Sequence, residues 1–303
     1  MGCVLITGAS SGIGLATALE LGRAGHTVHA TMRNVGRAQR LCDMAAAEEI
    51  PLSIVAMDVD SDESVAEAVE KIRRKSGRID VLVNNAGIER IGAIEELPLE
   101  AFRAVMETNY FGALRTIQAV LPEMRERRSG CIVNVSSVAG RIANSPMGPY
   151  TASKWALEAL SEALAQEVKP FNVRVAIVEP GIIDTPMARR IEAPPDNSHY
   201  PQGARFAALF HASLENPRPA PLVAVKIREI VESGTWHLRH PVGVDAQPFL
   251  DWRASMTDEE WTDWGALDND AWYARIERDF GLNARPHKPK VATAGSGIPG
   301  LDM

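Results

Sequence analysis

The chain has 303 residues, of which 46% are hydrophobic, and it carries a formal net charge of −7 at pH 7. This apolar share suffices for one large core, and the acidic balance argues against a surface that binds the phosphate backbone of nucleic acids. No apolar run is long enough to span a bilayer, and three separated cysteines without a signal peptide indicate the reducing cytoplasm.

Short runs of β-branched residues alternate with stretches of helical period along the first two thirds of the chain. In chain order, the predicted elements are a strand at 3–7, a helix at 13–25, strands at 27–32 and 52–59, a helix, a strand at 81–86, a helix at 99–121, a strand at 131–137, a helix at 149–168 and a strand at 174–179. Asp60 or Ser61 is expected to cap the helix that follows the third of these strands.

Strands that are apolar on both faces and joined by helices run parallel within one sheet. A helix at 221–233 and a last strand at 236–242 complete the pattern. The sequence therefore predicts an α/β fold, a doubly wound, Rossmann-type parallel sheet of seven strands with helices on both faces.

The C-terminal part of the chain departs from this alternation. Residues 244–285 hold four of the six tryptophans, and Thr257 with Glu260 forms a capping-box pattern, so a helical extension is expected there. The Pro-, Gly- and Lys-rich tail at 286–303 is expected to be disordered. We therefore predict a cofactor-binding and catalytic domain at 1–243, with a substrate loop at about 184–221, followed by the extension and the tail.

Three glycines stand where the first predicted strand meets the first predicted helix, in Thr7-Gly8-Ala9-Ser10-Ser11-Gly12-Ile13-Gly14. Glycines at such a junction let the backbone turn tightly and approach a pyrophosphate, whose charge the start of a helix favours. Alone, the pattern also fits a plain tight turn. Because strand, helix and early position agree, it predicts dinucleotide binding.

The end of the second predicted strand bears on the choice between NAD and NADP. An acidic side chain there holds the ribose 2′-hydroxyl of NAD, whereas an arginine accommodates the 2′-phosphate of NADP. Met32 stands where the acid is expected, and Arg33 follows it, so the pattern favours NADP(H) over NAD, although Arg33 also fits a solvated loop. Asp58 and Val59 end the third strand, where adenine is expected to lie, and Asp58 also fits a helix cap.

Ser137, Tyr150 and Lys154 form the strongest candidate catalytic group. Tyr150 and Lys154 are four residues apart on one predicted helix, so their side chains share a face. A neighbouring ammonium and a positive nicotinamide ring are expected to lower the pKa of the phenol, which is ordinarily near ~10. Ser137 ends the preceding strand at the sheet edge where ligands bind, and its hydroxyl is placed to hold a substrate oxygen.

These motifs, in this order, resemble those of the short-chain dehydrogenase/reductase superfamily over about residues 3–242. The matching segments are Thr-Gly-x-x-x-Gly-x-Gly at 7–14, Asn-Asn-Ala-Gly at 84–87, Asn109, Ser137, Tyr-x-x-x-Lys at 150–154, and Pro180-Gly181 followed by Thr185. The resemblance implies a catalytic set of Asn109, Ser137, Tyr150 and Lys154. Asn109 is then expected to interrupt its helix and to hold a water that links Lys154 to solvent.

The resemblance also implies a cofactor site. Its expected members are Gly8, Ser10, Ser11, Gly12, Ile13, Gly14, Arg33, Asp58, Val59, Asn85, Ala86, Gly87, Tyr150, Lys154, Pro180, Gly181, Ile183 and Thr185. Among these, Ile183 and Thr185 are expected at the nicotinamide amide and Lys154 at its ribose. No metal site is expected, because the seven histidines show no ligand spacing.

Within the superfamily, the segments after the second strand and around Asn109 are similar to hydroxysteroid and retinol dehydrogenases. The resemblance implies an oxidoreductase for a ketone or aldehyde and its alcohol. The apolar residues of 186–210 suit a bulky hydrophobic substrate and equally fit ordinary packing under a lid. A 3-ketoacyl-thioester reductase is the enzymatic alternative, and a non-catalytic NADP-binding regulator is the alternative of another class. The family also implies a homodimer or homotetramer, formed through the helices near 99–121 and 149–168.

Overall fold

The computed structural model describes residues 1–194 and 197–285. The disorder predicted for 286–303 lies outside these residues. Within them, no helix combines the length and the apolar character that a membrane crossing requires.

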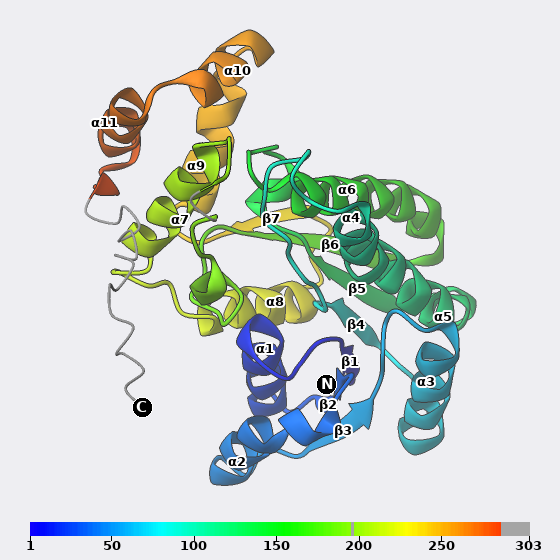
Figure 1. The fold of residues 1–303 in the computed structure, drawn as a ribbon. Helices are drawn as coiled ribbons and strands as arrows, with labels where there is room; N and C mark the ends of the chain where they lie inside the picture. Colours follow the sequence, from blue (N-terminus) through cyan, green and yellow to red (C-terminus); the bar gives the residue numbers. More distant parts are fainter. Residues whose placement is uncertain (195–196, 286–303) are drawn as a thin grey trace, which may run out of the picture.

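Seven strands form one sheet in which every neighbouring pair is parallel, as the sequence predicted (Figure 1). In chain order they are β1 (Cys3–Ile6), β2 (Thr27–Met32), β3 (Leu52–Ala56), β4 (Val81–Asn84), β5 (Gly130–Val135), β6 (Val173–Pro180) and β7 (Arg239–Val242). Their spatial order is β3-β2-β1-β4-β5-β6-β7. The chain reverses direction across the sheet between β1 and β4, which opens a crevice at their carboxyl ends.

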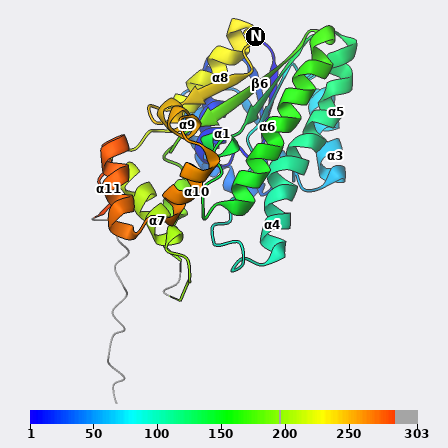
Figure 2. The same ribbon diagram turned by 90° about the horizontal axis from the view of Figure 1, so that it is seen from above.

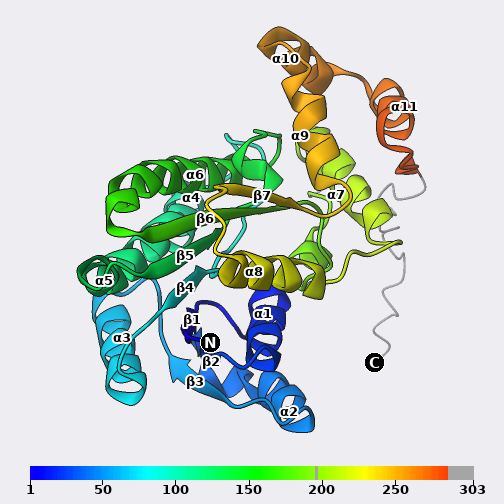
Figure 3. The ribbon, with the colours of Figure 1, turned by 180° about the vertical axis from the view of Figure 1, so that it is seen from behind.

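Helices cover both faces of the sheet (Figures 1 and 3). One face carries α1 (Gly12–Arg23), α2 (Gln39–Ala47) and α8 (Pro221–Ser233), and the other carries α3 (Asp62–Ser76), α4 (Leu99–Met106), α5 (Gly112–Glu126) and α6 (Gly148–Val168). Alternate residues of β1 enter separate cores, since Val4 and Ile6 pack on one face while Leu5 packs on the other. Each such buried aliphatic side chain contributes roughly 1.5–3 kcal/mol.

A third group of helices lies beyond the carboxyl edge of the sheet (Figure 2). It consists of α7 (Gln202–Ser213), α9 (Ala246–Ala254), α10 (Asp258–Ala266) and α11 (Asn269–Phe280). The capping box predicted at Thr257 and Glu260 is present and starts α10. Trp264 and Trp272 are buried where α10 and α11 pack on α7, so the predicted helical extension has its own apolar cluster.

The helix predicted at 99–121 is three elements. After α4, residues Glu107–Phe111 form a π-helical segment, and α5 then continues to Glu126, past Pro122 inside the helix. The π segment spans one turn only, so its shift of the helical period is too brief for apolar spacing to reveal. Single 3-10 turns lie at Val35–Arg37, Val138–Gly140, Lys169–Phe171 and Ala188–Arg190.

Other boundaries also differ from the prediction. The last strand begins at Arg239 rather than at Trp236, because Trp236 is 43% exposed and stacks on Lys169. Helix α2 was not predicted, since it buries only Leu41 and Ala45 and so has little apolar pattern. Ser61, rather than Asp60, caps α3.

Candidate active site

A cavity of about 550 Å³ opens at the carboxyl edge of the sheet. Its lining comes from the residues that follow or end β1 to β6, together with residues 185–188 and 190, the first two turns of α6 and Phe210 of α7. Parallel strands present all their carboxyl ends at one edge, so residues far apart in the sequence meet there.

Most of the predicted cofactor residues line this cavity. They are Gly8, Ser10, Ser11, Gly12, Ile13, Arg33, Asp58, Val59, Asn85, Ala86, Gly87, Tyr150, Lys154, Pro180, Gly181, Ile183 and Thr185. Ser137 lines it as well. Two predicted site residues, Gly14 and Asn109, do not belong to this lining. They lie next to it and hold its residues in place.

The turn between β1 and α1 is held by hydrogen bonds to the β4 loop. Thr7 Oγ1 accepts hydrogen bonds from the backbone N–H groups of Asn85 and Ala86, each at 2.9 Å. Asn85 Nδ2 donates to the carbonyls of Thr7 and Gly8 at 2.9 and 3.1 Å. Asn85 therefore lies at the cavity, while its amide nitrogen supports the glycine-rich turn.

The glycines of this turn meet two different demands. Gly8 has φ +68°, a conformation that favours glycine, and a Cβ there would lie 2.8 Å from Ala86 Cα. At Gly14 a Cβ would lie 2.5 Å from the carbonyl oxygen of Gly8 and 2.4 Å from Asn85 Nδ2. The Ser11 side chain leaves the start of α1 uncapped. The backbone therefore passes close to the uncapped start of α1, and this arrangement fits a pyrophosphate.

Two exposed arginines stand at the β2 side of the cavity, Arg33 and Arg37. Buried Met32 ends β2, so no carboxylate occupies that position. Across the cavity, Asp60 accepts a hydrogen bond from Thr108 Oγ1 at 3.0 Å, and the Asp58 carboxylate accepts one from the Asp60 N–H at 3.2 Å. Asp58 thus turns its own loop and is not the helix cap.

Ser137, Tyr150 and Lys154 meet at one end of the cavity. Tyr150 lies in the first turn of α6, half-buried, and Lys154 follows one turn later with only 5% exposure. Lys154 Nζ donates to the Val135 carbonyl at 2.8 Å and lies 5.6 Å from the centre of the Tyr150 ring. Ser137 Oγ accepts the N–H of Ala139 at 3.1 Å, which fixes the serine at the end of β5.

The electrostatics of this group differ from the expectation. Burial raises the pKa of Tyr150 above its usual value, the Glu89 carboxylate raises it further, and a hydrogen bond with Ser137 lowers it. Burial also lowers the pKa of Lys154 to about 8. Burial and Glu89 therefore set the direction of the Tyr150 pKa in the protein alone, whereas the predicted lowering also depends on the positive nicotinamide ring of a bound cofactor.

Asn109 lies in the π-helical segment, as expected of a residue that interrupts its helix. Its Oδ1 accepts the Ile88 N–H at 2.8 Å, and its Nδ2 donates to the Ile88 carbonyl and to Ser153 Oγ, both at 2.9 Å. The residue is 2% exposed. The amide thus joins the β4 loop to α6 directly next to Lys154.

Sequence reasoning missed several residues of the cavity, of which Arg37, Asp60, Glu89 and Arg190 carry charge. Burial raises the pKa of Glu89 to about 7, and the positive charges of Arg190 and Arg90 act against that rise. Glu89 follows the Asn-Asn-Ala-Gly segment by two residues, so its position after β4 was the available signal. Arg190 sits in a 3-10 turn whose placement depends on tertiary packing.

Two buried acidic residues lie outside the active-site lining. They are Glu158 on α6 and Glu179 on β6, which are 4% and 1% exposed. Glu158 is the charge that raises the pKa of Lys154, against its burial. Arg239 Nε lies 3.1 Å from Glu158 and 3.9 Å from Glu179, and Arg141 lies 3.5 Å from Glu179. Burial raises the pKa of Glu179 from 4.5 to about 7, and the Glu158 charge adds to that rise.

This pair gives a pH dependence of stability that Glu179→Gln should remove. A raised carboxyl pKa means that the folded chain holds the proton more tightly than the unfolded chain, so this contribution is lost as pH rises from 4.5 to about 7. The free energy of unfolding of the variant minus that of wild type should increase by ~2 kcal/mol between pH 5 and pH 8. Urea unfolding at both pH values measures this gain.

The control for that experiment is Glu162→Gln. Glu162 bonds the same arginine, with Arg239 Nη2 at 2.9 Å, but its side chain is 55% exposed and Arg239 lowers its pKa. That variant should not gain on wild type as pH rises. Equal gains in both variants would rule out burial of Glu179 as the cause.

Comparisons with known proteins point to one family. The family model described as short chain dehydrogenase matches residues 2–196. Retinol dehydrogenase 8 of Bos taurus is 40% identical over 242 residues, which are 74% of this chain and 77% of that protein. A 3-oxoacyl-(acyl-carrier-protein) reductase of Pseudomonas aeruginosa is 39% identical over 187 residues, 62% of this chain and 76% of that protein.

Solved structures agree with these sequence matches. A short-chain dehydrogenase from Streptomyces avermitilis superposes with a TM-score of 0.75 at 35% identity, covering 87% of this chain and 95% of that one. An actinorhodin polyketide ketoreductase with NADPH gives a TM-score of 0.71 at 29% identity, covering 79% of this chain and 95% of that one. Both likenesses extend well beyond the glycine-rich turn and include most of the sheet.

Proposed function

The chain belongs to the short-chain dehydrogenase family and is an NAD(P)-dependent oxidoreductase, and from that premise we propose that it uses NADP(H) to interconvert a ketone or aldehyde and its alcohol. The observation that carries the proposal is the meeting of Ser137, Tyr150 and Lys154 at one end of a cavity whose other walls include the glycine-rich turn. The turn, the uncapped start of α1 and two arginines fit a phosphorylated dinucleotide.

In reduction, Tyr150 acts as the proton donor. Its raised pKa keeps the phenol protonated at neutral pH, which suits transfer of that proton to a developing alkoxide. Ser137 holds the carbonyl oxygen beside it, where its hydroxyl stabilises negative charge. Bound NADPH supplies the hydride to the carbonyl carbon. In oxidation the same tyrosine must first lose its proton, and the positive charge of Lys154 favours that loss.

Lys154 and Asn109 keep the proton path in place. Lys154 also holds the ribose hydroxyls of the cofactor in this proposal, while its bond to the Val135 carbonyl fixes the direction of the ammonium. Asn109 positions the segment beside it, and a water at the π segment would connect Lys154 to solvent.

The preference for NADP(H) over NAD(H) rests on Arg33. Arg33→Ala should reduce the ratio of kcat/KM for NADPH over NADH by on the order of 10- to 100-fold, the cost of losing a charge-assisted hydrogen bond to a 2′-phosphate. Steady-state kinetics with both cofactors measure this ratio. Arg40→Ala is the matched control, because Arg40 is exposed on nearby α2 and does not line the cavity. An unchanged ratio in Arg33→Ala would assign the discrimination to another group, with Arg37 the first to test.

For the substrate we propose a bulky hydrophobic carbonyl compound or alcohol of steroid, retinoid or aryl-ketone type. Met147, Met187 and Phe210 give the Tyr150 end of the cavity apolar walls, and the likeness to a retinol dehydrogenase supports this class. The likeness to a 3-oxoacyl reductase keeps a ketoacyl thioester as the second candidate. Consumption of NADPH with retinal, a steroid ketone, an aryl ketone and an acetoacetyl thioester separates them, and turnover confined to the thioester would overturn the first choice.

The remaining assignments are also proposals. We propose that residues 1–243 bind cofactor and carry the chemistry, and that 184–221 and 244–285 cover the substrate. A homodimer or homotetramer through α4, α5 and α6 is supported by the exposed Leu99 on α4, Trp155 on α6 and Phe111 at the end of the π segment that leads into α5. Three free cysteines support a cytoplasmic location.

A further inference from the structure

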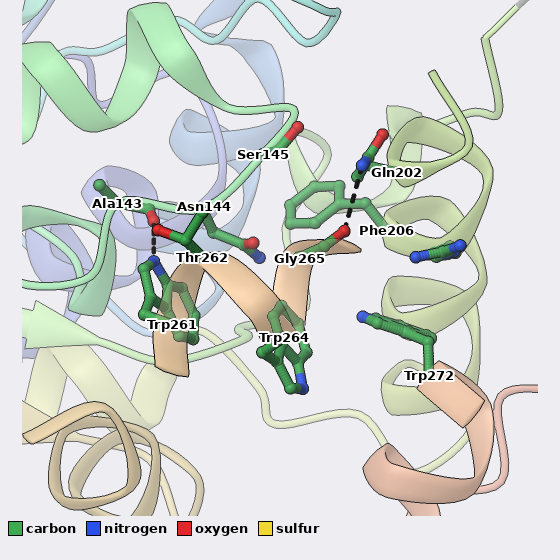
Figure 4. Close-up of a pocket in the computed structure, with 11 residues that line it drawn as sticks. Ala143, Asn144, Ser145, Gln202, Phe206, Trp261, Thr262, Trp264, Gly265 and Trp272 are labelled. Atoms are coloured by element: carbon green, nitrogen blue, oxygen red, sulfur yellow. Dashed lines mark hydrogen bonds between the residues drawn. The ribbon is translucent and has the colours of Figure 1, made fainter. Parts of the chain in front are cut away.

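A second cavity, of about 220 Å³, lies between the loop Ala143–Ser145, helix α7 and the helices of the extension (Figure 4). Among the described residues, its lining has no member in common with that of the active-site cavity. It is also larger than the ~150 Å³ that suffices to enclose a benzene ring. The cavity therefore has room for a small ligand of its own.

Four of its eleven lining residues are aromatic. Trp261 and Trp264 stack with centroids 5.0 Å apart and planes within 4° of parallel. Trp272 lies 5.8 Å from Trp264 at 51°, and Phe206 closes the α7 side (Figure 4). Such faces favour a flat ring that can pack against them edge-on or offset.

Three buried side-chain atoms of the lining have no hydrogen-bond partner among the described residues: the donors Arg205 Nη1 and Trp264 Nε1 and the acceptor Gln202 Oε1. Trp272 is 4% exposed, and Figure 4 shows its indole nitrogen directed toward the space beside Trp264 and Phe206. Arg205 is also 4% exposed; its Nε donates to Asn269 Oδ1 at 2.7 Å, while its buried Nη1 has no partner. Donors left unpaired in this way are costly unless an acceptor reaches them.

Charge at the cavity is positive on its α7 side. Arg205 carries the buried positive charge, which Asp268 partly offsets, and burial lowers its pKa without removing it from the cationic range. A guanidinium and an indole N–H can both donate to a carboxylate. The guanidinium binds a carboxylate more strongly than a neutral oxygen, because both partners are charged.

We propose that this cavity binds a small aromatic carboxylate of about the size of benzoate, with its ring among Trp261, Trp264 and Trp272 and its carboxylate toward Trp272 Nε1 and Arg205. The site is separate from hydride transfer, so it stands whether or not the proposed substrate class is correct.

The same cavity touches the active site through two contacts. Trp261 Nε1 donates to the Ala143 carbonyl at 3.0 Å, in the loop that joins Ser137 to Tyr150. Phe206 packs on Phe210 with centroids 4.6 Å apart, and Phe210 lines the active-site cavity. A ligand against Trp261 and Phe206 therefore contacts the elements that hold the catalytic loop.

The test is titration of the intact chain with sodium benzoate, followed by tryptophan fluorescence and calorimetry in the absence of NADPH. Wild type should show saturable binding at one site. Asn144→Asp places a carboxylate at the cavity wall with little change in shape, because the Asn144 amide faces the cavity in Figure 4. It should weaken benzoate binding about tenfold through like-charge repulsion. Binding of neutral benzyl alcohol should change by less than about twofold.

Two further variants complete the design. Trp272→Phe keeps an aromatic wall and removes the N–H, and it should also weaken benzoate. Asn216→Asp makes the same charge change on an exposed residue away from the cavity and should leave binding unchanged. Absence of saturable binding in wild type, or equal affinities in wild type, Asn144→Asp and Trp272→Phe, would overturn the proposal. Neither result depends on turnover, so each is distinct from failure of the proposed function.

Discussion

Tyr150→Phe should lower kcat by about 10³-fold, because loss of one phenolic proton donor removes general acid catalysis from the reaction. The ring remains, so packing in the first turn of α6 and contact with Met147, Ile191 and Phe206 should be retained. Affinity for NADPH should stay within about threefold of wild type, since the hydroxyl is needed in the transition state more than for binding. Single-turnover kinetics and a fluorescence titration with NADPH measure the two quantities.

Tyr110→Phe is the matched control for this variant. Tyr110 lies in the π segment and contacts Phe111 edge-to-face with centroids 5.0 Å apart, outside the active-site lining. Its turnover should equal that of wild type. Near-normal turnover in Tyr150→Phe would remove the tyrosine from the chemistry. If wild type bound NADPH but reduced no carbonyl compound, the non-catalytic regulator would be the better description.

Gly14→Val should abolish detectable NADPH binding, with a rise in Kd of more than about 100-fold. Its first side-chain carbon would overlap the Gly8 carbonyl and Asn85 Nδ2, at 2.5 and 2.4 Å. Asn85 must then release the Thr7 and Gly8 carbonyls, and the turn that approaches the pyrophosphate opens. Calorimetric titration with NADPH gives the affinity, and circular dichroism reports whether the variant remains folded.

A smaller change at the same position separates misfolding from loss of the turn. Gly14→Ala adds only the overlapping carbon, so it should fold and still bind NADPH at least tenfold more weakly. Gly265→Ala is the control in α10, where an added carbon meets no atom within 4 Å. It should bind NADPH as wild type does. Normal affinity in Gly14→Ala would show that the turn can shift without cost.

The sequence predicted the parallel sheet and most of the active-site lining for a physical reason. In a doubly wound sheet the carboxyl ends of the parallel strands lie along one edge. A residue that follows a strand, such as Ser137 or Asn85, is therefore placed at that edge once the strand is recognised. The α6 pair of Tyr150 and Lys154 needs only the helical period.

Features that depend on packing between distant segments were not predictable in this way. The π segment around Asn109 is too short to show in the apolar spacing, and only the resemblance to the family pointed to an interruption there. Arg190 reaches the cavity only through the fold of its loop. The direction of the Tyr150 pKa depends on burial and on Glu89, neither of which appears in the motif. Helix α7 and the walls of the second cavity depend on how the extension packs.

The bonds of Asn109 have a consequence for the cost of reaction. One buried amide ties the backbone of Ile88, and with it the Glu89 segment, to Ser153 on the helix that carries Tyr150 and Lys154. These groups are therefore preorganised before any ligand arrives. Folding fixes their orientation. Little of the free energy of substrate binding is therefore needed to orient them when the carbonyl compound enters.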